Sequence, residues 1–202
     1  MTDSILIVLF AYLAGSISSA VWYGRIFHKV DIRKHGSGNA GATNSLRVLG
    51  KTAGVIVLII DFLKGLLPVL LAKYLNFEQP IVLLVGFVAV LGHLLPVFSN
   101  FKGGKGVATS MGVVVAIMPL VALVAFITFT ITVFLTRYVS LGSILGAASL
   151  PLSVLILKGQ SPYLLLFSVV LALLLTFTHR KNIERLVSGV ESKFGNKTKT
   201  NT

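Results

Sequence analysis

The sequence predicts an all-α membrane protein with seven transmembrane helices, its N-terminus outside and its C-terminus in the cytoplasm. Two observations carry this prediction. Of the 202 residues, 55% are hydrophobic and 12% are charged, which is about half the charged share of a typical soluble domain. The net charge is +12, and the basic residues cluster between and after apolar runs, as expected of cytoplasmic loops.

Five apolar runs are long enough to be spans. They cover residues 4–23, 52–74, 79–98, 139–157 and 162–178, and a span needs about 20 residues. No basic segment precedes the first run, so we expect a first span there rather than a cleaved signal peptide. Spans and short loops fill residues 1–190, which predicts a single transmembrane domain, and residues 191–202 are expected to form a polar, disordered tail.

A further apolar stretch, residues 105–137, is too long for one straight span. Its roughly 30 residues would reach about 45 Å as a helix, whereas the hydrocarbon core is about 30 Å thick. Pro119 lies near the middle of the stretch, and proline starts a helix or breaks one. The stretch is therefore either one kinked span or two short spans that meet near Pro119.

The distribution of charge favours two short spans. With seven spans, 15 basic residues lie on the cytoplasmic side, Lys73 and Lys158 lie outside, and Lys64 lies within a span. With six spans, the basic residues divide almost evenly between the two sides, so the positive-inside rule selects seven. The 15 residues are Arg25, Lys29, Arg33, Lys34, Arg47, Lys51, Lys102, Lys105, Arg137, Arg180, Lys181, Arg185, Lys193, Lys197 and Lys199.

The first glycine-rich segment covers residues 36–44, with the sequence GSGNAGATN. Its G-x-G-x-x-G spacing marks a dinucleotide site only after a strand, and the chain offers no such strand. A tight turn that re-enters the membrane is one interpretation. Exposed glycine N–H groups, followed by polar side chains and an arginine, favour a phosphate-binding loop instead. Its predicted members are Gly36, Ser37, Gly38, Asn39, Gly41, Thr43, Asn44 and Arg47.

The second glycine-rich segment is KGGKG at residues 102–106. It is not a Walker A loop, because that motif places Ser or Thr directly after its lysine. The segment leads into an apolar span, whose first N–H groups would add to the lysines in attracting an anion. A plain basic cytoplasmic loop is the alternative. The predicted anion-binding residues are Lys102, Gly103, Gly104, Lys105 and Gly106.

Three polar residues lie within predicted spans. Asp61 and Lys64 are three apart and share a helix face. A structural ion pair and a catalytic role are both open for them, because intramembrane charges usually face a polar interior. His93 is expected to be a packing histidine.

The last span ends in the sequence HRKNIER, residues 179–185. On a helix, His179, Asn182 and Arg185 recur every three residues and roughly share a face. This arrangement suits a ligand-binding face, although a basic end that stops translocation would also explain it.

The chain has no cysteine, which excludes disulfides, thiolate nucleophiles and thiolate metal sites. Its four histidines and six acidic residues do not cluster at ligand spacing. We therefore expect no metal and no cofactor.

Four motifs together resemble the bacterial acyl-phosphate:glycerol-3-phosphate acyltransferases, a family of small integral membrane enzymes. They are G-S-G-N-x-G-A-T-N at 36–44, F-K-G-G-K-G-V-A-T at 101–109, R-Y-x-S-L-x-S at 137–143 and H-R-x-N-I-x-R at 179–185. The likeness extends over nearly the whole chain, as far as residue 190.

The resemblance implies a multi-pass enzyme of the bacterial cytoplasmic (inner) membrane whose active site faces the cytoplasm. It would move a fatty acyl group from acyl phosphate to the 1-hydroxyl of glycerol 3-phosphate, the first acylation step of phospholipid synthesis. Residues 1–190 would form the catalytic domain. The partners would be these two substrates and the lipid bilayer, with no nucleic acid and no obligate protein partner.

The reaction brings two phosphates together, so several cations and N–H donors are needed. We expect Arg47, Lys105 and the glycine-loop amides to bind phosphate. The residues expected to serve in catalysis are Ser37, Lys105, Ser143, His179 and Asn182. Acyl phosphate is already activated, so we expect direct attack in a ternary complex. The proton acceptor stays open between His179 and a substrate phosphate.

Two other functions share some of these features. A transporter or flippase for a phosphate-bearing solute would use similar anion loops, but its polar residues should extend through the bilayer. Here only Asp61, Lys64 and His93 lie deep. A scaffold that binds anionic lipid gives no reason for two glycine-rich loops. An enzyme acting at the membrane surface fits the sequence better than either.

Overall fold

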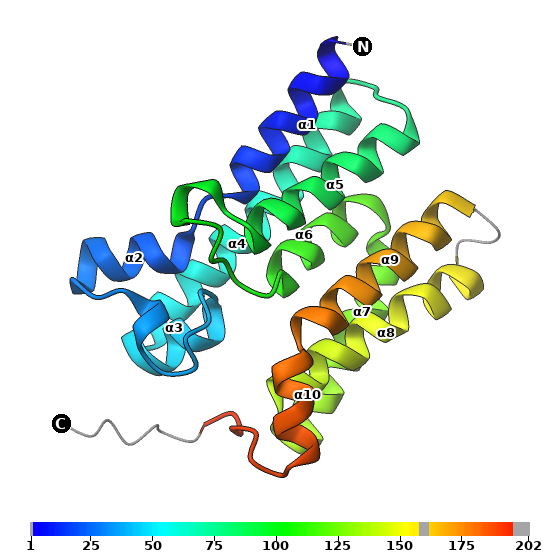
Figure 1. Ribbon diagram of the computed structural model, residues 1–202. Helices are drawn as coiled ribbons and strands as arrows, with labels where there is room; N and C mark the ends of the chain where they lie inside the picture. Colours follow the sequence, from blue (N-terminus) through cyan, green and yellow to red (C-terminus); the bar gives the residue numbers. More distant parts are fainter. Residues whose placement is uncertain (1, 158–161, 196–202) are drawn as a thin grey trace. The chain divides into compact units, whose positions relative to one another are not determined.

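The computed structural model describes residues 2–157 and 162–195, and this part of the chain is helical with no strand (Figure 1). It forms two compact units, of which the first ends at Ile117 and the second begins at Met118. The all-α class predicted from the sequence is confirmed.

The first unit contains the helices that lead into and out of both glycine-rich segments. Its helices are α1 (Thr2–Gly15), α2 (Ser19–His28), η1 (Ile32–Lys34), α3 (Ala42–Leu49), α4 (Lys51–Tyr74), α5 (Gln79–Leu94), η2 (Val97–Ser99) and α6 (Val107–Ile117). The long helix α4 packs against α1, α2, α3, α5 and α6, and α1 also packs along α5. The short helices α2 and α3 lie at one end of this unit (Figure 1).

Small residues let α4 and α6 approach each other closely. A side chain at Gly65 of α4 would collide with the carbonyl of Thr109, and one at Gly112 of α6 would collide with the carbonyl of Phe62. Such contacts between small residues are typical of helix packing in membranes, where burial of apolar surface from water gives no driving force. They fix the first turns of α6, directly after the second glycine-rich segment.

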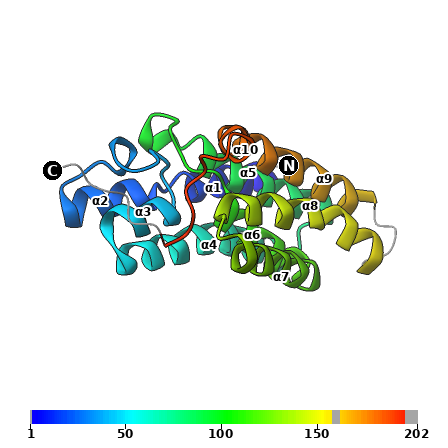
Figure 2. The same ribbon diagram turned by 90° about the horizontal axis from the view of Figure 1, so that it is seen from below.

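The second unit contains α7 (Pro119–Thr136), α8 (Val139–Leu157), α9 (Pro162–Thr178) and α10 (Arg180–Val187). Helix α8 packs against both α7 and α9 (Figures 1 and 2). Helix α10 is bent by 60° from α9. After α10 the chain turns back, and the backbone N–H of Phe194 donates to the carbonyl of Arg137, at 2.7 Å.

The apolar stretch around Pro119 is two helices, as the charge distribution indicated. Helix α6 ends at Ile117, Met118 has non-helical dihedral angles, and Pro119 starts α7. Proline suits this first position because its missing N–H would have no partner there in any case. The two helices have 11 and 18 residues, because Pro119 lies nearer to the start of the stretch than to its end.

Within the described residues, four helices are long and apolar enough to cross a membrane: α4, α5 extended to Ser99, α7 and α8. The number rises to six if the bent pairs α1–α2 and α9–α10 each count as one span, and α6 is a shorter apolar helix. Large apolar side chains lie on the outside of these helices, such as Phe134, which is 84% exposed. This is the surface expected of helices that contact lipid.

Candidate active site

The predicted site residues fall into two groups, one in each unit. The first unit holds both glycine-rich segments, which we call the first glycine loop (residues 35–41, with the start of α3) and the second glycine loop (residues 100–106). The second unit holds Ser143, His179 and Asn182.

The first glycine loop is a tight turn braced by Asn44. The Asn44 amide nitrogen donates to the carbonyls of Ile32 (3.2 Å) and His35 (3.0 Å), and its Oδ1 accepts from the backbone N–H of Ser37 (2.9 Å). Gly36 and Gly38 have φ of +60° and +72°, a region that favours glycine. A side chain at Gly36 would also collide with the Asn44 amide. Asn44 is thus placed as a brace for the loop.

The surface of this loop is open. Ser37 and Gly38 are exposed, while Asn39, Thr43 and Arg47 are half-buried. Arg47 lies in the last turn of α3 and has an interaction partner. The exposed positions are those that a ligand could reach, and the role predicted for Ser37 stays a prediction.

The second glycine loop is seated on His93, the penultimate residue of α5. The backbone N–H of Gly104 donates to the carbonyl of His93, at 3.2 Å. A side chain at Gly103 would collide with that same carbonyl, and one at Gly104 would collide with Nε2 of the His93 ring. Only glycine therefore fits at these two positions. Lys102 is exposed, and Lys105 is half-buried with an interaction partner.

The two glycine loops touch each other. A Cβ placed on Gly104 would lie 2.8 Å from the carbonyl oxygen of Ala40 in the first loop. The sequence suggested that both loops could serve one site, and within the first unit they lie side by side. Two segments that are far apart in the chain thus lie next to each other.

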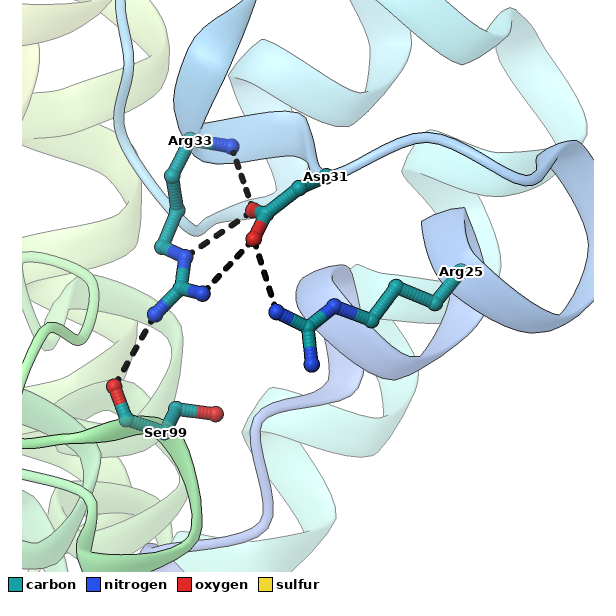
Figure 3. Close-up of polar contacts among 4 residues, drawn as sticks. All are labelled: Arg25, Asp31, Arg33 and Ser99. Carbon is teal, nitrogen blue, oxygen red and sulfur yellow. Dashed lines mark hydrogen bonds and ion pairs between the residues drawn. The ribbon is translucent and has the colours of Figure 1, made fainter.

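A cluster of charges ties the same two loops together (Figure 3). Asp31 accepts from the backbone N–H and the guanidinium of Arg33, with distances of 2.7–3.1 Å, and from Arg25 at 2.9 Å. Nη1 of Arg33 donates to the carbonyl of Ser99, in η2, at 2.9 Å. The Arg33 guanidinium therefore joins the start of the first loop to the start of the second. We call this group the Asp31 cluster.

Hydrogen bonds fix the protonation of this cluster. The bonds from Arg33 and, less strongly, from Arg25 outweigh partial burial and hold the pKa of Asp31 well below its usual range. The same bonds raise the pKa of Arg33. Both groups are therefore charged at neutral pH. Sequence reasoning did not find Asp31. An aspartate two residues before an arginine, in a basic loop, could have indicated this ion pair.

A buried ion pair lies deeper in the first unit. Nζ of Lys64 is 2.8 Å from Oδ1 of Asp61, and both side chains are almost fully buried. The structural ion pair considered from the sequence is therefore present.

In the second unit, polar side chains converge on Glu191. Its Oε1 accepts from Ser140 Oγ and from Asn182 Nδ2, and its Oε2 accepts from Arg185 Nε, each at 2.6 Å. The Glu191 side chain is only 7% exposed. Asn182 and Arg185 thus share a helix face, as predicted from their spacing. We call these four residues the Glu191 cluster.

Glu191 carries a negative charge at neutral pH. Burial raises its pKa, but the hydrogen bonds from Ser140, Asn182 and Arg185 outweigh burial and lower the pKa overall. Sequence reasoning placed residue 191 in the tail and missed this contact. The available signal was a lone carboxylate in an otherwise basic segment, six residues after Arg185. Residues 196–202 of the predicted tail lie outside the described part of the chain.

His179 and Ser143 lie near this cluster in the chain but bond elsewhere. Nδ1 of His179 lies 2.8 Å from the carbonyl of Leu175, which can only accept a hydrogen bond. Nδ1 therefore carries a proton, and in the neutral ring Nε2 is the basic nitrogen. The Ser143 hydroxyl donates to the carbonyl of Val139, at 2.9 Å. His179 and Ser143 are both largely buried.

Comparison with known proteins identifies a family of relatives. The sequence profile of a family described as "Glycerol-3-phosphate acyltransferase" matches residues 5–189. A glycerol-3-phosphate acyltransferase from Fusobacterium nucleatum is 44% identical, covering 93% of this chain and 96% of the relative. One from Trichlorobacter lovleyi is 45% identical, covering 96% and 99%.

Solved structures give the same result. The crystal structure of PlsY (YgiH), an integral membrane glycerol 3-phosphate acyltransferase, in its glycerol 3-phosphate form has a TM-score of 0.87 and 44% sequence identity, covering 96% of each chain. Its lysphosphatidic acid form has the same TM-score, with 42% identity and the same coverage. With a profile match over almost the whole chain and relatives above 40% identity, this membrane protein belongs to the glycerol-3-phosphate acyltransferase family.

Proposed function

We propose that the protein moves a fatty acyl group from acyl phosphate to the 1-hydroxyl of glycerol 3-phosphate, giving 1-acylglycerol 3-phosphate and inorganic phosphate. The contact between the two glycine loops, at Gly104 and Ala40, carries the proposal. Two neighbouring loops with N–H donors and cations can hold two phosphate groups that would otherwise repel each other. The relatives named above support this choice of acceptor and product.

The transfer needs no covalent intermediate. The acceptor hydroxyl oxygen forms an ester bond with the acyl carbon, and the bond between that carbon and the phosphate oxygen breaks. Phosphate leaves with the electron pair. We assign the phosphates to Arg47, Lys105 and the loop amides, and we assign Ser37, Ser143, His179 and Asn182 to the transfer step. Positive groups are needed where the carbonyl oxygen gains charge.

The hydroxyl proton has two possible acceptors. One is an oxygen of the departing phosphate, and the other is Nε2 of His179, which is the basic nitrogen when Nδ1 donates to Leu175. A His179→Gln variant separates them. If activity loses the pH dependence that the wild type shows, His179 is the acceptor. If activity drops but keeps the same pH profile, the phosphate takes the proton.

The decisive assay is release of inorganic phosphate from acyl phosphate by the full-length protein in detergent. Release that depends on glycerol 3-phosphate is expected, and Lys105→Ala and His179→Ala should lower it strongly. Lys73→Met is a matched control, because Lys73 lies at the far end of α4 from the loops and donates to the Ala116 carbonyl. Trapping of a stable acyl-serine would overturn direct attack. Uptake of a phosphate-bearing solute into vesicles, without product, would favour a transporter instead.

We propose seven spans, with the N-terminus outside, the C-terminus inside and the site facing the cytoplasm of the bacterial inner membrane. Four long apolar helices, two bent pairs and the short helix α6 supply seven apolar segments. The basic residues of the described chain support the orientation, and Lys158 lies outside the described residues.

Cysteine labelling tests this topology, since the chain has no cysteine of its own. An impermeant thiol reagent applied to intact cells should label Glu78→Cys, between α4 and α5, and should leave Lys102→Cys unlabelled. The reverse pattern would contradict the proposed orientation.

A further inference from the structure

Asp61 is the centre of a buried polar network that joins three segments of the first unit. Its Oδ1 accepts from Ser19 Oγ at 2.6 Å and lies 2.8 Å from Nζ of Lys64. Lys64 also donates to the carbonyl of Ile17, at 2.7 Å. Nδ1 of His93 lies 3.6 Å from the same Oδ1. The network thus connects the α1–α2 junction, α4 and the end of α5.

Stability alone does not explain this network. Two charges within an apolar helix are costly to bury, and replacing a buried ion pair with apolar residues is often neutral or stabilising. The side chains of Asp61 and Lys64 are only 2% and 4% exposed. Directional hydrogen bonds to one carboxylate do, however, fix the positions of the groups that donate them.

Both glycine loops are linked to residues of this network. His93 supports the second loop directly, because its carbonyl accepts from Gly104 and its ring Nε2 lies against Gly104. Ser19 is the first residue of α2, the helix that leads to the first loop. The two loops in turn touch at Ala40. A shift of the His93 ring would therefore move the surface on which the loops meet.

The His93 ring has one feature that a packing histidine would not need. Its Nδ1 is buried and has no hydrogen-bond partner, because 3.6 Å is too long for such a bond. Unsatisfied buried polar groups are rare and require an explanation. Attraction to the Asp61 carboxylate explains the orientation of this ring, with Nδ1 toward the ion pair and Nε2 toward the loop.

We propose that Asp61, Lys64, Ser19 and His93 form a positioning network that holds the two glycine loops in the geometry that binds phosphate. His93 is the element of the network that contacts the loop. These are positioning residues, since they act through the loop backbone. The inference rests on the proposed role of the loops in binding the substrates' phosphates.

The test separates substrate binding from turnover in the full-length protein. His93→Ala should raise the KM for at least one phosphate-bearing substrate by tenfold or more, with kcat within threefold of wild type. His93→Gln, which can place a nitrogen near the position of Nε2, should restore much of the lost affinity. Asp61→Asn should also raise KM, and the Asp61→Asn/His93→Ala pair should raise it by less than the product of the two effects, because both act through one contact. Lys73→Met should leave KM unchanged.

An unchanged KM in a folded His93→Ala protein would overturn the network's role, even if the unfolding temperature fell. If His93→Ala does not fold, a spin label supplies a second measurement. Placed on Lys102→Cys in the otherwise cysteine-free chain, the label should become more mobile when Asp61→Asn is added. If the label were equally mobile with and without the added substitution, the inference would also be overturned. The absence of acyl transfer by the wild type would refute the proposed function instead, and the label would still test the network.

Discussion

The two units hold their predicted site residues in different ways. In the first unit, glycine backbone lies directly against its neighbours: Gly103 lies against the His93 carbonyl, and Gly104 lies against the His93 ring and the Ala40 carbonyl. In the second unit, side chains meet side chains: Ser140, Asn182 and Arg185 all donate to Glu191. A contact made by backbone tolerates no added atom, whereas a contact made by side chains tolerates a replacement that keeps the same donors and acceptors.

The largest effect is expected from Gly104→Ala. The added methyl group would collide with the His93 ring and would lie 2.8 Å from the Ala40 carbonyl, so the loops must separate. A misplacement of 1 Å can cost about 100-fold in rate, and we expect a loss of kcat/KM of this order. The control is Gly146→Ala, whose methyl would lie 3.0 Å from its nearest neighbour, in α7–α8 packing. Wild-type kcat/KM in Gly104→Ala would show that the loops need not touch.

A smaller effect is expected in the second unit, where Glu191→Ala removes the shared acceptor of three donors. Removing the acceptor of a buried hydrogen bond costs about 1–3 kcal/mol, so we expect about a tenfold loss of activity and a lower unfolding temperature. Glu191→Gln keeps one acceptor oxygen and should lose less. Glu184→Gln is the control, because Glu184 is an exposed carboxylate on α10. If Glu191→Ala matched this control, Glu191 would have no role in holding Asn182.

Within the Asp31 cluster, the two arginines differ in exposure and in the partners that they bind. Arg33 is 19% exposed and joins the two loops, whereas Arg25 is 57% exposed and bonds only to Asp31 among the contacts described. Exposed ion pairs contribute about 0–1 kcal/mol. We therefore expect Arg33→Met to raise KM severalfold and Arg25→Met to change KM by less than twofold. Equal effects of the two variants would show that Asp31, rather than the bond to Ser99, is what matters.

The smallest expected effect is on how the unfolding temperature depends on pH. The pKa values of Asp31 and Glu191 are lowered in the folded protein. Each charge therefore contributes stability that is fully present above the ordinary carboxyl pKa, near 4, and is lost as pH falls through the lower folded value. The gap in unfolding temperature between wild type and Asp31→Asn, or Glu191→Gln, should be constant from pH 8 to 6 and should narrow below about pH 4. A gap that narrowed between pH 8 and 6 would mean that another group titrates.

Features that depend on residue type alone could be predicted from the sequence. The break at Pro119 followed from proline and span length, and the glycine loops followed from glycines next to cations. The contact partners could not be predicted. Ser140 and Glu191 are 51 positions apart, and nothing local in either residue indicates the other. In the same way, Asn44 looks like a ligand-binding amide in the sequence, and only the fold shows that its hydrogen bonds brace a turn.

The contact partners of the intramembrane residues could not be predicted from the sequence either. The spacing of Asp61 and Lys64 predicted one helix face, and they do form an ion pair. Their connection to His93 and Ser19 required three helices to come together, which no periodicity in the sequence reports. Burying these charges is costly, which indicates that they have a role. The role that we propose is to position the two glycine loops.

The return of the chain after α10 has a practical consequence for work with this protein. A boundary drawn at residue 190, where the apolar sequence and the motifs end, would delete Glu191 and the Phe194 backbone bond to Arg137. A shortened protein of that kind would leave Ser140, Asn182 and Arg185 without their common acceptor and would give a misleading measure of activity. Purification tags and fusion partners therefore belong after residue 202, so that Glu191 and Phe194 keep their contacts.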